Sequence, residues 1–223
     1  MYEVIPGFLG DDRVAALRGQ LDAMEWEDGL DTARSARNRK RNLQLTVNTA
    51  QAVPLLQQLV QELVTHPPVL QWAEPRRVAG MQFARYDEGM FYGSHNDAAI
   101  FRQQGLPLRA DISFTVFLEE PADYDGGELV LETAAGEVAL KEAAGSLVLY
   151  DTGLTHRVET VTRGQRLVIV GWIESMVRSA EARGVLRDLN PLIRAAMERD
   201  PDGDEVIGLR RVRASLMRLW AET

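Results

Sequence analysis

The chain has 223 residues, of which 45% are hydrophobic and 26% charged, as in an ordinary soluble globular protein. Its net charge of −8 and isoelectric point near 5.0 argue against a general binder of nucleic acids or anionic membranes. The absence of cysteine excludes disulfides, zinc–thiolate sites and cysteine nucleophiles. The amino terminus lacks the basic and apolar segments of a signal peptide, and no apolar run approaches the roughly 20 residues of a membrane span, so we expect a cytoplasmic protein.

Helical patterns near the amino terminus predict two helices that pack on the rest of the protein. Asp11-Asp12 precedes apolar residues at helical spacing, and we expect this pair to cap a first helix. A second helix is predicted with Asn48 or Thr49 as its cap. It should stop at His66, because the prolines that follow push this residue out of the α region. His66 is therefore interpreted as a structural or solvated residue.

Residues 2–9 are typical of a short strand or an extended lead-in. Residues 27–46 show little periodicity and predict irregular structure between the two helices. They include the basic run 34–41, for which a solvated loop is the simpler interpretation and an anion-facing rim the alternative.

From residue 76 the hydrophobic pattern changes from helical to alternating, which predicts a series of short strands. We expect them at residues 78–86, 90–97, 110–119, 127–133, 136–141, 145–151, 154–161 and 165–174. Strands at this spacing with no helix between them favour a sandwich or barrel over a parallel α/β sheet. The sequence therefore predicts a mostly β protein with flanking helices, of the α+β class.

A helical pattern returns at residues 175–199 and 205–222. The expected organisation is an N-terminal helical support at 1–75, a β core at 76–174 and a C-terminal helical extension at 175–223.

His95 and Asp97 lie at the end of the second predicted strand. Side chains at positions i and i+2 of a strand leave the same face, so this imidazole and this carboxylate should project together as adjacent ligands for a divalent metal. A His-x-Asp pair alone is a weak signal.

His156, in a later strand, completes a set of two imidazoles and one carboxylate. Such a set covers one face of an octahedron and leaves three positions open, as in non-haem Fe(II) oxygen chemistry. A lone histidine in a strand is otherwise more often a satisfied interior residue.

Arg166 opens the last predicted strand, where an arginine would otherwise be an edge or surface residue. Its planar guanidinium can hold the distal carboxylate of a metal-bound keto acid with two hydrogen bonds. Arg157 and Arg163 are rival candidates. Arg157 neighbours His156 along a strand and should face the opposite way, and Arg163 lies in a turn, so Arg166 is preferred.

The combination of His95-x-Asp97, His156 and, ten residues later, Arg166 resembles the Fe(II)/2-oxoglutarate dioxygenases of the prolyl 4-hydroxylase type, and is closer still to the bacterial PKHD-type hydroxylases. Further matching segments are Arg85-Tyr86, Arg109-x-Asp111-Ile112-Ser113, Asp123-Tyr124-Asp125-Gly126-Gly127-Glu128-Leu129-Val130, Val161-Thr162-Arg163-Gly164 and Trp172-Ile173-Glu174-Ser175-Met176-Val177-Arg178. The resemblance covers almost the whole chain. Ala98, where an asparagine is expected, and Thr160, where a proline is common, depart from the pattern and leave the metal set intact.

The resemblance implies a double-stranded β-helix (a cupin-like jelly roll) with Fe(II) inside one end. It also implies that 2-oxoglutarate chelates the iron while Arg166 holds its C5 carboxylate, and Tyr86 matches a tyrosine that lines the 2-oxoglutarate pocket. Strand alternation places Ser113 and Thr115 on one face, where a hydroxyl could join that pocket. Trp172 shares a face with Arg166 and could wall the iron. For these four residues, ordinary core packing is the alternative.

We therefore expect an Fe(II)- and 2-oxoglutarate-dependent dioxygenase, a hydroxylase that acts with O2 on an unactivated C–H bond and forms succinate and CO2, with L-ascorbate as a candidate reductant. The stretch from Ala98 to Pro107 leaves directly from the metal strand and is interpreted as a mobile lid that orders when substrate binds.

Two other functions remain as alternatives. One is a non-catalytic jelly roll that sequesters metal or senses iron and 2-oxoglutarate, although a sequestering site would gain by filling all coordination positions. The other is a metal hydrolase, which has no evident use for Arg166. Whether the primary substrate is a protein residue or a small molecule stays open, and so does the oligomeric state, for which a homo-oligomer is a candidate.

Overall fold

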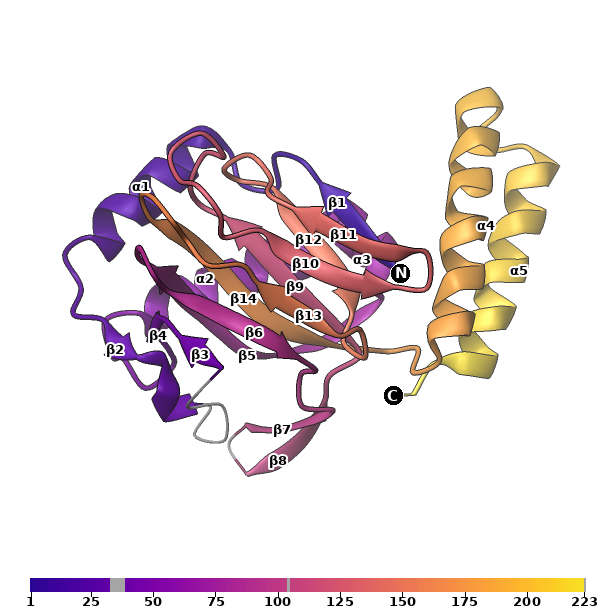
Figure 1. The fold of residues 1–223 in the computed structure, drawn as a ribbon. Helices are drawn as coiled ribbons and strands as arrows, with labels where there is room; N and C mark the ends of the chain where they lie inside the picture. The colour runs from indigo at the N-terminus through magenta and orange to yellow at the C-terminus, as the bar shows by residue number, and fades with distance from the viewer. Residues whose placement is uncertain (33–38, 104, 223) are drawn as a thin grey trace.

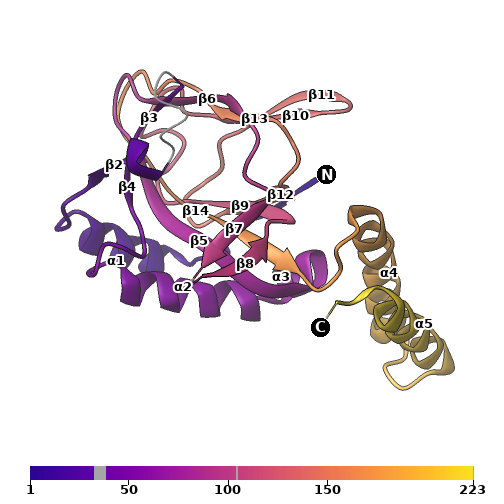
Figure 2. The same ribbon diagram turned by 90° about the horizontal axis from the view of Figure 1, so that it is seen from below.

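A computed structural model describes residues 1–32, 39–103 and 105–222 and shows two large antiparallel sheets that face each other, with a separate two-stranded sheet (Figures 1 and 2). The larger sheet has the order β1-β12-β9-β14-β5-β4-β2, and the smaller has the order β11-β10-β13-β6-β3. From β5 onward most connections cross from one sheet to the other (β5 to β6, β9 to β10, and β11 through β12 and β13 to β14), which is the arrangement of a double-stranded β-helix. The predicted jelly-roll core, in a protein that also contains helices, is confirmed.

All eight strands predicted from the alternating pattern are present. In the larger sheet they are β5 (Pro75–Tyr86), β9 (Ile112–Phe117), β12 (Leu147–Asp151) and β14 (Arg166–Ser175). In the smaller sheet they are β6 (Phe91–His95), β10 (Leu129–Thr133), β11 (Gly136–Leu140) and β13 (His156–Val158). The extended lead-in forms β1 (Tyr2–Ile5), which pairs with β12 at the edge of the larger sheet.

Strand β9 shows how the alternation builds two separate apolar layers. Ile112, Phe114 and Val116 belong to a hydrophobic cluster shared with the helices on the outer face of the larger sheet. Ser113 and Thr115 point the other way and line a cavity between the sheets. Because every side chain of β9 is buried, the strand needs apolar residues on its outer face and tolerates hydroxyls only where the cavity lies.

Three helices, α1 (Asp11–Leu21), α2 (Val53–Thr65) and α3 (Pro67–Ala73), cover the outer face of the larger sheet (Figure 2). The predicted caps are wrong. Gly10 is the N-cap of α1, and the predicted pair lies in its first turn. Ala52 is the N-cap of α2, and the hydroxyl of Thr49 instead accepts the N–H of Thr46 and donates to Glu27. His66 ends α2 as predicted, but the two prolines after it begin α3, where they fit the first helical positions.

The stretch predicted as irregular, residues 27–46, contains β2 (Glu27–Asp28), the 3-10 helix η1 (Gly29–Thr32), β3 (Lys40–Arg41) and β4 (Leu43–Leu45). These elements are too short to show a periodic pattern, so their pairing with β5 and β6 could not be predicted. Residues 34–38 of the basic run lie outside the described residues.

The stretch predicted as a lid loop instead contains a β-hairpin, made of β7 (Ile100–Gln103) and β8 (Leu106–Arg109). Among the described residues the two strands pair only with each other, and their small and polar composition carries no alternating pattern that would predict them. Whether the hairpin moves when substrate binds remains a prediction.

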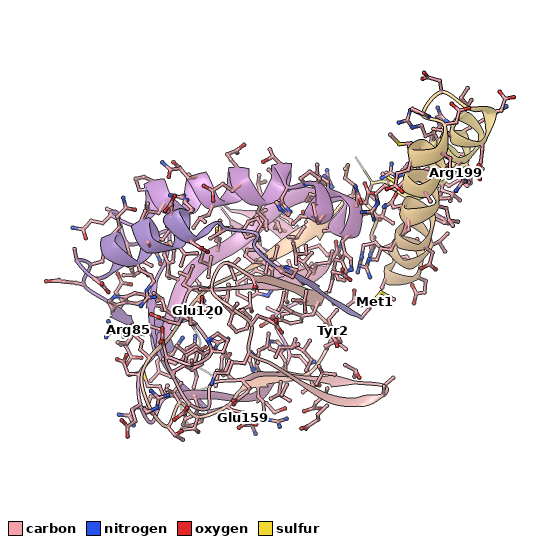
Figure 3. All side chains as sticks on the ribbon, turned by 90° about the horizontal axis from the view of Figure 1, so that it is seen from above. Met1, Tyr2, Arg85, Glu120, Glu159 and Arg199 are labelled. Carbon is pink, nitrogen blue, oxygen red and sulfur yellow. The ribbon has the colours of Figure 1, made fainter. Side chains whose placement is uncertain are left out.

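Two C-terminal helices, α4 (Ala180–Arg199) and α5 (Asp204–Trp220), form an antiparallel hairpin beside the barrel, with Arg199 at its far end (Figures 1 and 3). The first of them begins later than predicted, because β14 continues to Ser175 and Ser179 caps the helix by accepting the N–H of Ala182. Among the described residues, no helix is both long and apolar enough to cross a bilayer.

Candidate active site

A cavity of about 660 Å³ lies between the two sheets of the barrel. Every residue proposed for the site from the sequence lines it: Tyr86, His95, Asp97, Ser113, Thr115, His156, Arg166 and Trp172. The fold thus brings together side chains from β5, β6, β9, β13 and β14, which lie far apart in the chain.

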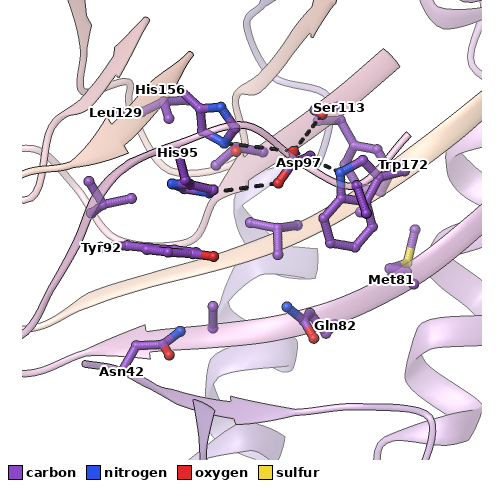
Figure 4. A pocket seen from close by; sticks show the side chains of 18 of the residues that line it. Asn42, Met81, Gln82, Tyr92, His95, Asp97, Ser113, Leu129, His156 and Trp172 are labelled. Atoms are coloured by element: carbon purple, nitrogen blue, oxygen red, sulfur yellow. Dashed lines mark hydrogen bonds and ion pairs between the residues drawn. The ribbon is translucent and has the colours of Figure 1, made fainter. Parts of the chain in front are cut away.

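His95, Asp97 and His156 form a cluster in which one ligand atom from each residue lies within 4.8 Å of the others. Strand pairing explains the two imidazoles, because His95 and His156 are direct partners in the smaller sheet. Asp97 lies two residues beyond the end of β6 and between the imidazoles and the Trp172 ring (Figure 4). The Nε2 atoms of His95 and His156 are 3.7 and 3.6 Å from its carboxylate oxygens, too far for hydrogen bonds but close enough for all three residues to share one ion.

Backbone contacts hold both imidazoles in the orientation that a metal requires. The Nδ1 atom of His95 lies 2.9 Å from the carbonyl of Gly93, and that of His156 lies 3.0 Å from the carbonyl of Leu154. If each Nδ1 donates to its carbonyl, each Nε2 keeps a lone pair directed at the cluster. Burial, followed by the neighbouring His156, lowers the pKa of His95 to about 4, so this ring is neutral at pH 7.

Arg166 provides a buried positive charge in the same cavity. It is 1% exposed, and its guanidinium lies 5.1 Å from the ring of Tyr86 and 5.5 Å from that of Phe117. Its Nε and Nη1 atoms find no hydrogen-bond partner among the described residues. A buried guanidinium without an anion is costly, so the site fits a ligand that brings a carboxylate.

The two rival arginines are engaged elsewhere. Arg157 donates to Glu137 at 2.7 and 2.8 Å and to Glu159 at 2.7 Å. Arg163 donates to Asp125 at 2.7 Å and lies at the surface. Of these three arginines, only Arg166 lines the cavity.

Tyrosine hydroxyls complete the wall beside Arg166. Burial raises the pKa of Tyr86, an effect that the charge of Arg166 and a hydrogen bond with Asn42 partly offset. Burial also raises the pKa of Tyr150 well above its usual value. Both hydroxyls therefore stay protonated at neutral pH and can donate to an anionic ligand.

Several residues that line the cavity were not predicted. Tyr150 had a usable signal, because it alternates with Val148 on a predicted strand; the structure pairs it with Ser113. Tyr92 stacks on His95 with ring centroids 3.6 Å apart. The sequence does not suggest this contact, because residues three apart on a regular strand point to opposite faces. Lys40 lies on a two-residue strand with no pattern, and its Nζ lies 5.1 Å from the Tyr92 ring. Burial lowers the pKa of Lys40 to about 8.

Comparison with known proteins agrees with this geometry. Residues 81–174, the segment that supplies all eight candidates, match the 2OG-Fe(II) oxygenase superfamily. A PKHD-type hydroxylase from Hyphomonas neptunium is 39% identical over 221 residues, which are 98% of each chain. A PKHD-type hydroxylase from Caulobacter sp. is 40% identical over 225 residues, again 98% of each chain. The crystal structure of a Pseudomonas putida prolyl-4-hydroxylase is similar with a TM-score of 0.57 at 25% identity, over 78% of this chain and 92% of that one.

These matches show that the protein is an oxidoreductase of a class that depends on Fe(II) and 2-oxoglutarate and uses O2. Within this class, the chain belongs to the PKHD-type hydroxylase family. The relatives do not identify its primary substrate.

Proposed function

We propose that His95, Asp97 and His156 hold the Fe(II) and that Arg166 holds the distal carboxylate of 2-oxoglutarate. This proposal rests on one observation: the same cavity contains a three-residue ligand set and a buried guanidinium whose Nε and Nη1 find no partner among the described residues. When bound, Fe(II) and 2-oxoglutarate supply the activation of O2 and the oxidative decarboxylation that yields succinate and CO2.

The other cavity residues then orient the co-substrate and keep water out. The guanidinium of Arg166 donates two hydrogen bonds to the carboxylate, and the rings of Tyr86 and Phe117 fix its plane. The hydroxyls of Tyr86, beside the guanidinium, and of Thr115, elsewhere in the cavity lining, are further donors. Leu129, Val158 and Val170 give this end of the cavity an apolar wall, which limits side reactions by excluding water.

We infer that the reaction is hydroxylation of a C–H bond. The relatives are named hydroxylases, and the cavity continues beyond the ligand set to Met81, Gln82 and Phe101, which leaves room for a second organic molecule. A peptidyl residue and a small molecule both remain candidates for it. L-Ascorbate as reductant, a cytoplasmic location, a homo-oligomer and the division of the chain at residues 75/76 and 174/175 stay predictions from the sequence.

The decisive test measures succinate. Purified protein with Fe(II) and 2-oxoglutarate should form succinate in the presence of O2, even slowly and without primary substrate. His95→Ala, Asp97→Ala and His156→Ala should each abolish this turnover, whereas Arg163→Ala, which changes a surface ion pair, should not. A protein that binds both ligands but forms no succinate would be a sensor or a store. Unchanged turnover in the three alanine variants would place the metal elsewhere.

A further inference from the structure

The carboxylate of Asp97 is held by two hydrogen bonds to the same oxygen. The hydroxyl of Ser113 and the indole Nε1 of Trp172 each donate to Oδ2 at 2.8 Å (Figure 4). The hydroxyl of Thr152, 3.1 Å from that of Ser113, can donate to it in turn, which leaves the Ser113 proton for Asp97. Oδ1 lies 3.7 Å from Nε2 of His95 and receives no hydrogen bond from the described residues, whereas Oδ2 lies 3.6 Å from Nε2 of His156. The two carboxylate oxygens are therefore not equivalent.

Trp172 reaches this position because of an irregularity in the neighbouring strand. The pairing of β14 with β5 shifts between Val170 and Trp172, so that two residues of β5, Gly80 and Met81, oppose one residue of β14. Gly80 has φ +56°, and a Cβ at this position would lie 2.7 Å from the indole ring. The bulge thus makes room for the ring to lie flat against the strand with its N–H directed at Asp97.

The other side of the indole is covered by the β7–β8 hairpin. The ring of Phe101 stacks on that of Trp172 with centroids 4.2 Å apart and an interplanar angle of 30°. Phe101 also lines the cavity. A continuous chain of contacts therefore runs from the hairpin, through two stacked rings, to one oxygen of Asp97.

We propose that Trp172 is a positioning residue that keeps Asp97 a one-oxygen metal ligand, and that Phe101 holds Trp172 in place. This inference rests on the proposed metal site. Both oxygens lie near an imidazole, but Oδ2 is engaged by two donors, so Oδ1 is the oxygen that keeps its lone pairs for the metal. The two hydrogen bonds then oppose a swing of the carboxylate that would bind the metal through both oxygens and consume a position needed by co-substrate or O2. Because the indole is braced by the hairpin, displacement of the hairpin alters a metal ligand.

The test replaces Fe(II) by Co(II), whose visible spectrum reports the number and geometry of ligands without turnover. Trp172→Phe keeps an aromatic ring under Phe101 and removes only the donor. We expect Co(II) affinity to fall by about tenfold, the size of effect that loss of an outer hydrogen-bond partner has at metal sites, together with a changed spectrum. Phe101→Ala should change the spectrum in the same direction. Trp220→Phe and Ile100→Ala, matched substitutions on α5 and on the hairpin away from the cavity, should leave affinity and spectrum as in the parent.

The outcomes separate this inference from the proposed metal site. If His95→Ala binds Co(II) with the parent's affinity and spectrum, the metal site itself is wrong. If His95→Ala loses Co(II) but Trp172→Phe matches the parent in both measurements, the site stands and the positioning role of Trp172 is overturned. Should Trp172→Phe fail to fold, ¹⁵N spectra of the unaltered protein decide the question. One of its four indole N–H signals should move on Zn(II) binding and in Asp97→Ala, and no movement would overturn the inference.

Discussion

Arg166 and Lys40 bring two buried positive charges to one cavity, in different surroundings. An arginine keeps its charge in proteins, and Arg166 spreads it over a guanidinium between two aromatic rings. Lys40 is 6% exposed, hydrogen-bonded to Gln44 at 3.3 Å, and its pKa falls to about 8 chiefly because burial disfavours the ammonium. The charge of Arg166 is the one that we propose to bind a carboxylate, whereas the charge of Lys40 costs folding free energy to a degree that depends on pH.

Replacing Arg166 should weaken co-substrate binding specifically. A hydrogen bond to a charged group contributes about 1.5–3 kcal/mol, so Arg166→Ala should lower 2-oxoglutarate affinity by roughly ten- to a few-hundredfold. Arg166→Lys should recover part of the loss, because the charge survives but the planar fork does not. Calorimetric titration of 2-oxoglutarate into Zn(II)-loaded protein measures this directly. Arg163→Ala is the control, and a loss there with none in Arg166→Ala would show that the wrong arginine is assigned.

Lys40 should make stability depend on pH. Its pKa is 10.5 in an unfolded chain and about 8 in the folded protein, so between these values the unfolded chain binds more protons and stability rises with pH. Below pH 8 the full cost is present, up to about 3 kcal/mol. Lys40→Met should therefore remove part of the rise seen between pH 7 and pH 10 in urea unfolding of the metal-free protein. Arg41→Met, its exposed neighbour on β3, should leave the slope intact, and equal slopes for parent and Lys40→Met would contradict the prediction.

At the scale of elements, the β5 bulge connects backbone geometry to the metal ligand. Gly80 occupies a left-handed conformation that other residues rarely adopt, and the indole of Trp172 fills the space where a side chain would be. The bulge is thus specified by a glycine on one strand and a tryptophan on the other.

Gly80→Ala should destabilise the protein, both through its left-handed backbone and through contact of the added methyl group with the indole. A non-glycine residue in the left-handed region costs about 1–2 kcal/mol, and the close contact with Trp172 adds to this. In contrast, Gly208→Ala, in the interior of α5 with nothing within 4 Å of the added Cβ, should stabilise by up to about 1 kcal/mol. Urea unfolding compares the two variants, and a Gly80→Ala protein as stable as the parent would show that the bulge tolerates a side chain.

What the sequence predicts at this scale depends on the length of the pattern. Alternating stretches of six or more residues located the eight core strands, including β13, of which only three residues pair, and the cavity-facing positions of Ser113 and Thr115. Two- to four-residue strands such as β3 and the β7–β8 hairpin carry no periodic signal, so Lys40 and Phe101 were missed. The bulge that turns Trp172 towards Asp97 arises from pairing between strands distant in sequence. The sequence was therefore enough to name eight residues that line one cavity, but not the contacts by which these residues hold one another in place.

At the scale of the whole molecule, arginines fasten the α4–α5 hairpin to the barrel. Arg183 is buried and donates to Asp151 at 3.0 Å. Arg187 places its guanidinium 3.5 Å from the Trp72 ring and donates to the Trp72 carbonyl at 3.0 Å. Burial lowers the pKa of Arg187 to about 10. Within the hairpin, a separate cluster that includes Leu186 packs α4 against α5.

Apart from Val177, which precedes α4, the residues of that cluster belong to the hairpin, so loosening the junction should free the hairpin without separating its helices. Arg187→Ala removes a cation–π contact and a hydrogen bond from the junction, and should lower the free energy of local opening by about 2 kcal/mol. Hydrogen exchange should then accelerate in peptides at the α3–α4 contact, while β9 and 2-oxoglutarate affinity stay unchanged, since no cavity residue belongs to the hairpin. The matched control is Arg199→Ala, whose partner Glu205 lies within the hairpin and whose side chain is 60% exposed. If Arg187→Ala exchanges like the parent, this arginine does not hold the junction. If β9 also exchanges faster in Arg187→Ala, the barrel and the hairpin unfold as one unit.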